Sequence, residues 1–117
     1  MDLRQLSDEV ESVSRQYANA IGIARDDTWF LLKLQEEIGE LTQAFLMLTG
    51  RARKKGRTEQ ELDANFRAEM ADVLCHVLLM ARHHGIDLEA EIKTKWLTTQ
   101  PGEKNPSATE RAVEPRG

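Results

Sequence analysis

Apolar residues recur at steps of three and four along most of this chain, which is the spacing that places side chains on one face of an α-helix. Four such stripes predict helices over residues 3–21, 28–49, 58–84 and 87–99. None of the segments alternates like a half-buried strand. We therefore predict an all-α fold, a four-helix antiparallel bundle of long amphipathic helices. The stripe of the second helix consists of Leu31, Leu34, Ile38, Leu41, Phe45 and Leu48.

Polar caps and glycines mark the ends of these helices. Asp2 with Gln5, and Thr58 with Glu61, have the spacing of a capping box, in which two side chains satisfy two backbone N–H groups. Asp27 is expected to cap the second helix. The glycines that follow the first three stripes, where a left-handed residue commonly ends a helix, are Gly22, Gly50 and Gly85.

Composition and charge narrow the class of protein. The chain has 117 residues, with 16 Lys plus Arg and 20 Asp plus Glu, and its net charge is −4. We expect one domain over residues 1–100 and a flexible tail over 101–117, because all the prolines lie in this tail, which has little to bury. The mild acidity argues against a general nucleic-acid binder. Without an apolar run of ~18 residues or a signal-peptide core, the chain is expected to be cytoplasmic and to have no membrane partner.

The second and third helices carry apolar residues beside their main stripes, namely Leu32, Leu74, Leu78 and Leu79. A helix with such a wide apolar face usually packs against more than one neighbour. One chain of this size buries only a thin core. We therefore expect a homo-oligomer, in which copies of the chain cover these residues.

Acidic residues cluster on the second and third helices. Glu37 and Glu40 are three apart and share a helix face, and so do Glu69 and Asp72. Each of these four directly precedes an apolar residue, so both pairs should border the packed interface and not the outer surface. Glu36 lies beside the first pair. If the two helices are antiparallel neighbours, four carboxylates meet at one place.

Such a cluster needs something to offset its repulsion. Two like charges ~4 Å apart cost on the order of 4 kcal/mol at an effective dielectric constant of about 20. Protonation or a divalent cation would relieve that cost, and a set of carboxylate oxygens suits hard cations such as Mg²⁺ or Mn²⁺. The alternative is a solvated helix face, on which Lys33 and Glu37 form an ordinary i,i+4 ion pair.

Two acidic segments match a known pattern. The sequence EEIGEL at 36–41 resembles the E-E-x-x-E element of MazG-like nucleotide pyrophosphohydrolases, and EMADVL at 69–74 resembles their E-x-x-D element. The resemblance covers roughly residues 28–97. It implies an all-α fold assembled as a homodimer or homotetramer. It also implies hydrolysis of a nucleoside triphosphate between its α and β phosphates, in the manner of nucleotide-pool house-cleaning enzymes.

The resemblance further assigns roles to single residues. The positions that match the family's metal ligands, Glu37, Glu40, Glu69 and Asp72, would hold Mg²⁺, with Mn²⁺ as a possible substitute. Glu36 would join a further metal ion or orient the attacking water. All five are therefore candidate catalytic residues.

Four residues are candidates for binding the substrate. Lys93 and Lys95 resemble the family's basic element after the acidic motifs and are expected to contact phosphate, and Lys33 lies one turn before Glu37. Trp29 is a candidate for stacking on a base, although an aromatic residue there is also typical of a core. Gly39, inside the second helix, is expected where another backbone packs closely, since glycine costs about 1 kcal/mol in a helix.

Three other functions compete with this interpretation. Phosphoribosyl-ATP pyrophosphohydrolase shares the acidic helical site, and nothing in the sequence separates the two activities sharply. A di-iron carboxylate bundle would need a Glu-x-x-His motif on each of two helices, and the sequence contains none. A non-catalytic helical interaction module would carry the same carboxylates as surface residues.

Overall fold

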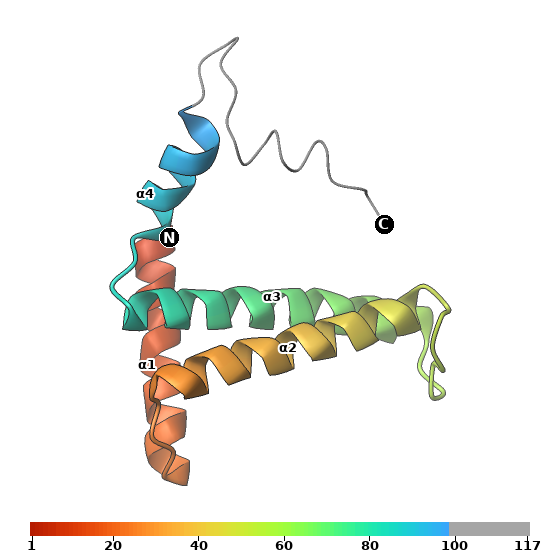
Figure 1. Cartoon of the computed structure of the whole chain (residues 1–117). Helices are drawn as coiled ribbons and strands as arrows, with labels where there is room; N and C mark the ends of the chain where they lie inside the picture. Colours follow the sequence, from red (N-terminus) through yellow and green to blue (C-terminus); the bar gives the residue numbers. More distant parts are fainter. Residues whose placement is uncertain (99–117) are drawn as a thin grey trace. The chain divides into compact units, whose positions relative to one another are not determined.

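The computed structural model describes residues 1–98, and these residues form helices and no strand. The order is α1 (Leu3–Ile21), α2 (Asp27–Leu48), α3 (Glu59–His83), α4 (Leu88–Ile92) and a π-helical turn, η1 (Lys93–Leu97) (Figure 1). The predicted all-α fold is confirmed for this part of the chain. The predicted tail at 101–117 and the predicted helix end at residue 99 lie outside the described residues. The chain divides into two units, Met1–His84 and a second that begins at Gly85.

The helix caps follow the sequence signals closely. Asp2 and Thr58 each form the predicted capping box, and Gly22 adopts the left-handed conformation with φ 72°. The cap of α2 is Asp26 and not Asp27, because the Asp26 carboxylate accepts the hydrogen bond from the Trp29 backbone N–H at 2.8 Å. Asp27 is therefore the first residue of the helix, with its side chain available for other contacts.

Within the first unit, α2 and α3 run side by side in opposite directions (Figure 1). The ring centroids of Phe45 and Phe66 lie 5.9 Å apart near the connecting loop, and those of Phe30 and His83 lie 4.4 Å apart at the other end. Helix α1 lies across this pair instead of alongside it, and its Asp8 pairs with Arg82 of α3. A four-helix antiparallel bundle is thus not confirmed: α1 crosses the pair, and α4 belongs to the second unit.

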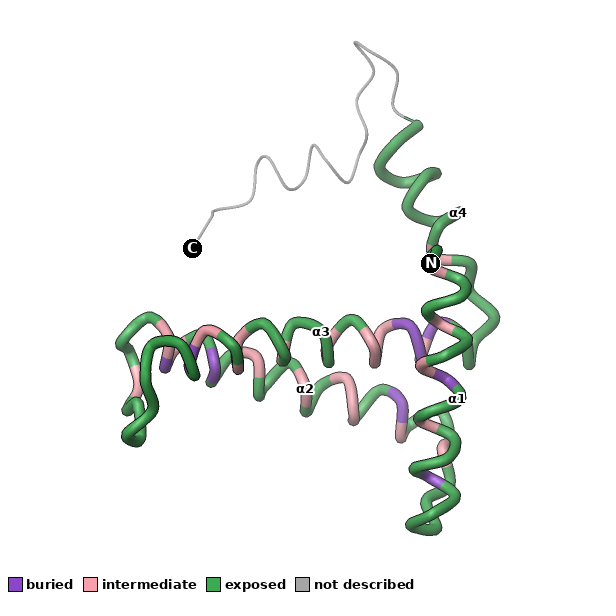
Figure 2. Tube along the Cα trace, turned by 180° about the vertical axis from the view of Figure 1, so that it is seen from behind, coloured by how far each residue is buried: buried purple, intermediate pink, exposed green. Residues whose placement is uncertain are grey.

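The core of the first unit is thin (Figure 2). Its buried apolar residues are Ala18, Phe30, Ala44, Met47, Leu62, Leu78, Leu79 and Ala81. Of the residues expected beside the main stripes, Leu78 and Leu79 are buried, whereas Leu32 and Leu74 are exposed.

Helix α2 presents a different face to α3 than its apolar stripe predicts. Phe30, Glu37 and Ala44 follow one another at intervals of seven residues; Phe30 and Ala44 are buried, and the Glu37 side chain is only 12% exposed. The residues one position further on are exposed instead, with Leu31 51%, Ile38 39% and Phe45 43% accessible. The other members of the predicted stripe, Leu34, Leu41 and Leu48, are half-buried, so α2 is turned from the predicted orientation by less than the ~100° that separates consecutive residues of a helix. The small Ala44 side chain lets the two helices approach closely on this face.

Helix α3 repeats the arrangement. Leu62, Glu69 and His76 are also spaced by seven residues; Leu62 is fully buried, and the other two are half-buried. Met70, one position after Glu69, is 51% exposed, and Leu74 is 48% exposed. Because the helices are antiparallel, positions that follow the two buried stripes fall on the same side of the pair. We call this side the apolar face, and it consists of Leu31, Ile38, Phe45, Met70 and Leu74.

The described part of the second unit is short. Asp87 caps α4 by accepting the Ala90 backbone N–H at 3.1 Å, and Lys93 forms an ion pair with Glu89 at 2.9 Å. Among the described helices of both units, none is long and apolar enough to cross a membrane.

Candidate metal centre

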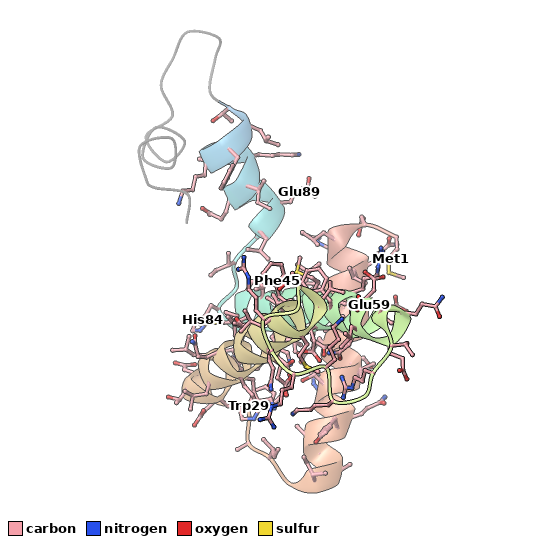
Figure 3. All side chains as sticks on the ribbon, turned by 90° about the vertical axis from the view of Figure 1, so that its right-hand side faces the viewer. Met1, Trp29, Phe45, Glu59, His84 and Glu89 are labelled. Carbon is pink, nitrogen blue, oxygen red and sulfur yellow. The ribbon has the colours of Figure 1, made fainter. Side chains whose placement is uncertain are left out.

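Three carboxylates from two helices meet between α2 and α3. Glu37 and Glu40 come from α2 and Glu69 comes from α3, and one oxygen of each lies within 4.8 Å of the others. Glu37 and Glu69 reach this place because both belong to the buried stripes of the helix pair, while Glu40 lies one turn after Glu37 at the edge. Figure 3 draws the side chains of both helices, with Trp29 and Phe45 marking α2.

The buried polar atoms of this centre lack partners. Among the described residues, the buried side-chain oxygens and nitrogens without a hydrogen bond are Glu37 Oε2, Glu69 Oε2 and His76 Nδ1. His76 Nε2 lies 3.7 Å from Glu37 Oε1, so the His76 ring is next to Glu37. A buried carboxylate oxygen without a donor costs free energy, and a bound cation or a proton would supply the missing partner.

Burial and mutual repulsion both disfavour charge in this centre. Burial first, and then the neighbouring Glu40, Asp72 and Glu69 carboxylates, raise the pKa of Glu37 to about 7. The pKa of Glu69 is raised by burial and by the charges of Asp72 and Glu40. Carboxyl groups in this state are readily neutralised, either by protons or by a divalent cation that displaces those protons.

The other two predicted acidic residues, Asp72 and Glu36, lie outside the group of three converging carboxylates. Asp72 is exposed one turn beyond Glu69; its carboxylate is not one of the three that converge, but its charge raises the pKa of both Glu37 and Glu69. Glu36 is also exposed, and its carboxylate lies 3.4 Å from Lys33 Nζ. The structure therefore brings together Glu37, Glu40 and Glu69, and it leaves Glu36 paired with Lys33.

Two of the four predicted substrate-binding residues lie near the carboxylates. Trp29 is half-buried, with its ring centroid 6.4 Å from that of His76. The Lys33 side chain is 32% exposed. Burial and then the Lys33 charge lower the pKa of His76, which makes the neutral imidazole the dominant form at pH 7. Lys93 and Lys95 belong to the second unit, so the structure describes them only within that unit.

The structure places His76 beside Glu37, and it shows no close backbone contact at Gly39 within one chain. A lone helical histidine is usually structural, but its spacing of seven residues from Glu69 is a signal that the two share a face. Gly39 was expected at a close backbone contact, yet a Cβ atom placed there would meet nothing within 4 Å in the described chain. Within one chain, close packing therefore does not explain this glycine.

Comparison with known proteins found none that is similar to this chain. A scan against protein-family models found no match for this chain, and searches of curated proteins and of solved structures found none either.

The donor set would suit a hard cation. Three carboxylates supply only oxygen ligands, and two of the carboxylates have a buried oxygen with no other partner. Mg²⁺ is bound by carboxylates together with water and substrate phosphates, and Mn²⁺ accepts similar ligands. Zinc, which prefers nitrogen and sulfur, suits these residues less well.

Proposed function

We propose that this protein is a Mg²⁺-dependent nucleoside triphosphate pyrophosphohydrolase. Water would attack a (deoxy)nucleoside triphosphate and break the bond between the α and β phosphates, giving a nucleoside monophosphate and pyrophosphate. The observation that carries the proposal is the convergence of Glu37, Glu40 and Glu69 from two antiparallel helices, with two buried carboxylate oxygens that lack partners. The resemblance of segments 36–41 and 69–74 to the MazG-like motifs supports the same chemistry.

The proposal assigns metal binding to Glu37, Glu40 and Glu69, with Asp72 at the margin as a fourth ligand. A triphosphate carries several negative charges and would be repelled by bare carboxylates. When bound, Mg²⁺ would supply Lewis-acid polarisation of the phosphoryl oxygens and neutralise charge on the departing pyrophosphate.

Side chains around the carboxylates would hold the substrate. Lys33 would turn from Glu36 to a phosphate oxygen, because the 3.4 Å contact with Glu36 is long and leaves the ammonium group partly exposed. Glu36, released from Lys33, would accept a hydrogen bond from the attacking water. Trp29 would stack on the base, and phosphate binding by Lys93 and Lys95 stays a prediction from the sequence alone.

A second copy of the chain would cover the apolar face of α2 and α3. The apolar face exposes five large side chains along one side of α2 and α3, and contiguous exposed apolar residues of this kind mark interaction surfaces. A helix pair from another copy would cover this face and produce the antiparallel four-helix bundle as a homodimer or homotetramer. Such an enzyme would act on the cytoplasmic nucleotide pool.

Pyrophosphate release tests the proposal directly. Purified protein would be incubated with a broad panel of ribo- and deoxyribonucleoside triphosphates, with Mg²⁺ and separately with Mn²⁺. We expect pyrophosphate from at least one substrate and none after chelation of the metal. Glu37→Gln and Glu69→Gln should each reduce the rate by at least about 100-fold, because each removes a charged metal ligand.

Asp63→Asn is the matched control, because Asp63 is an exposed carboxylate on α3 that pairs with Arg67 outside the centre. Mg²⁺ should also raise the melting temperature of the wild-type protein and of this control, but not of Glu69→Gln. Absence of pyrophosphate across the whole panel with both metals would reject the proposed activity. An equal thermal response of Glu69→Gln to Mg²⁺ would reject the assigned ligands.

A further inference from the structure

A second group of possible metal ligands lies away from the carboxylate centre. Asp27 is the first residue of α2, His83 is the last residue of α3, and His84 follows it as the C-cap. One ligand atom from each lies within 4.8 Å of the others. These residues are close together because α2 and α3 are antiparallel. The start of α2 therefore lies beside the end of α3, at the opposite end of the helix pair from the connecting loop (Figure 1).

His83 is held in position from two sides. Its Nε2 lies 2.6 Å from Asp27 Oδ1, and its ring stacks on Phe30 with centroids 4.4 Å apart. Phe30 is itself buried in the core and only 3% exposed, so it provides a fixed surface for the imidazole. The His83 ring therefore presents its nitrogen to Asp27 with little rotational freedom left.

His84 brings a second imidazole to the same place. Neighbouring residues at a helix end usually point in different directions, but here the two rings pack edge to face with centroids 5.0 Å apart. The hydrogen bonds of the described residues include none to the ring of His84, whereas Asp27 and His83 already pair with each other. The Asp27–His83 hydrogen bond does not by itself explain why a ring nitrogen of His84 also lies within 4.8 Å of the ligand atoms of Asp27 and His83.

We propose that Asp27, His83 and His84 form a binding site for a borderline divalent transition metal ion of the Zn²⁺ class. Two imidazoles and one carboxylate give a donor set of two nitrogens and one oxygen, which these ions prefer and Mg²⁺ does not. All three residues are exposed, so water or a further ligand would occupy the remaining coordination position. This inference does not depend on the proposed hydrolase activity, because it concerns different residues and a different class of metal.

The three ligand atoms lie within 4.8 Å of one another but must rearrange to coordinate one ion. Ligand atoms around a tetrahedral Zn²⁺ lie about 3.3 Å apart, given metal–ligand distances of about 2.0–2.2 Å. The His83–Asp27 pair at 2.6 Å must therefore open by several tenths of an ångström. The Asp27 side chain is 79% exposed and free to make this adjustment, while His83 stays against Phe30. The bound ion would tie the start of α2 to the end of α3.

Zinc binding by the full chain tests this site. Tag-free protein, stripped of metal with a chelator, would be titrated with ZnCl₂ by calorimetry in a buffer containing excess Mg²⁺, which occupies hard-ligand positions. We expect one Zn²⁺ per chain at this site. His84→Ala and Asp27→Asn should each weaken its binding by at least about tenfold, since each removes one of three ligands.

Two controls match the ligand types. His76→Asn removes the other imidazole of the chain, and Asp63→Asn removes an exposed carboxylate of α3; both should bind Zn²⁺ as the wild type does. Labelled imidazole nitrogens provide a measurement that needs no variant: Zn²⁺ should shift the NMR signals of His83 and His84 but not those of His76. Unchanged affinity in His84→Ala would overturn the proposal. Loss of binding in Glu69→Gln but not in His84→Ala would overturn it too, because the ion would then occupy the carboxylate centre.

Discussion

The surroundings of the Glu37 carboxyl group disfavour its ionised form. It lies in the interface of two helices beside two other carboxylates, and burial together with these neighbours raises its pKa to about 7 from 4.5. In the unfolded chain the group ionises near its ordinary pKa. Between pH 4.5 and pH 7 the folded state therefore binds more protons at Glu37 than the unfolded state does, and stability falls as pH rises through this window.

This linkage predicts the behaviour of Glu37→Gln in metal-free protein. At pH 8 the variant should be more stable to urea than the wild type by on the order of 1–2 kcal/mol, because glutamine carries no charge to bury. At pH 4.5, where Glu37 is protonated in the folded state, the difference should nearly vanish. Urea unfolding at both pH values measures the effect. A variant less stable than the wild type at pH 8 would mean that Glu37 is stabilised as an anion by a partner.

A second acidic residue shows the opposite behaviour. Glu11 of α1 is only 8% exposed, and it accepts hydrogen bonds from Arg25 at 2.8 and 3.0 Å and from Arg15 at 2.7 Å. The Arg25 hydrogen bonds, followed by the Arg15 pairing, outweigh burial and lower the pKa of Glu11 to about 2. The Glu11–Arg25 ion pair holds the loop before α2 against α1. Its stabilising contribution is complete above pH 4.5 and is lost as pH falls toward 2.

Glu11→Gln should therefore destabilise the protein at pH 7 by about 2–3 kcal/mol, because it leaves a nearly buried Arg25 guanidinium without its counter-charge. The double variant Glu11→Leu with Arg25→Met should recover most of that loss, since it removes both charges and keeps the volume filled. Thermal unfolding of the three proteins provides the measurement. Equal stability of Glu11→Gln and wild type would show that the ion pair is not coupled to folding.

Helix ends and helix faces differ in how far the sequence determines them. The ends depend on local chemistry, so Asp2, Thr58 and Gly22 marked them correctly, and the α2 cap was wrong by one residue only. The orientation of α2 depends on which neighbours are present. A stripe of large apolar residues predicted a core around Ile38, yet within one chain α2 turns the adjacent face, with Glu37 and Ala44, toward α3.

The same distinction applies to the candidate sites. Spacing along each helix was enough to group Glu37 with Glu40, because i,i+3 neighbours share a face whatever the fold. Pairing across helices needed the antiparallel register, which placed Glu69 beside them and also joined Asp27 to His83 and His84. That second group was missed because Asp27 lies 56 residues before His83 in the sequence, and no local pattern links them.

Helix capping gives a prediction for α3. Thr58 Oγ1 accepts the Glu61 backbone N–H at 3.1 Å, and the Glu61 carboxylate accepts the Thr58 backbone N–H at 2.8 Å. Thr58→Ala should lower the free energy of unfolding by about 1 kcal/mol, as a lost N-cap usually does. Thr42→Ala is the matched control: its hydroxyl only donates to the Ile38 carbonyl inside α2, so its loss should change stability by less than about 0.5 kcal/mol. Urea unfolding would compare the two, and equal losses would argue against the capping box.

For the whole molecule, the exposed apolar face predicts assembly. At micromolar concentration the protein should have twice or four times the 13.3 kDa mass of one chain by light scattering. Leu31→Glu or Leu74→Glu should shift this mass toward that of a monomer, because a buried charge opposes burial of the face. Gln60→Glu adds the same charge in the first turn of α3 and should leave the mass unchanged. A wild-type monomer at all concentrations would reject assembly through this face.

The seven-residue spacing of the stripes on α2 constrains how the length of this helix can change. One stripe faces the neighbouring helix and brings Glu37 to the other carboxylates, while the stripe beside it remains open. Inserting or deleting a single residue between Phe30 and Ala44 would rotate everything beyond it by about 100° and exchange the two stripes over half the helix. A change of a whole heptad keeps both stripes on their faces but moves one end of α2 by about 10.5 Å along α3, so changes of length should be tolerated in the flanking loops rather than inside this helix.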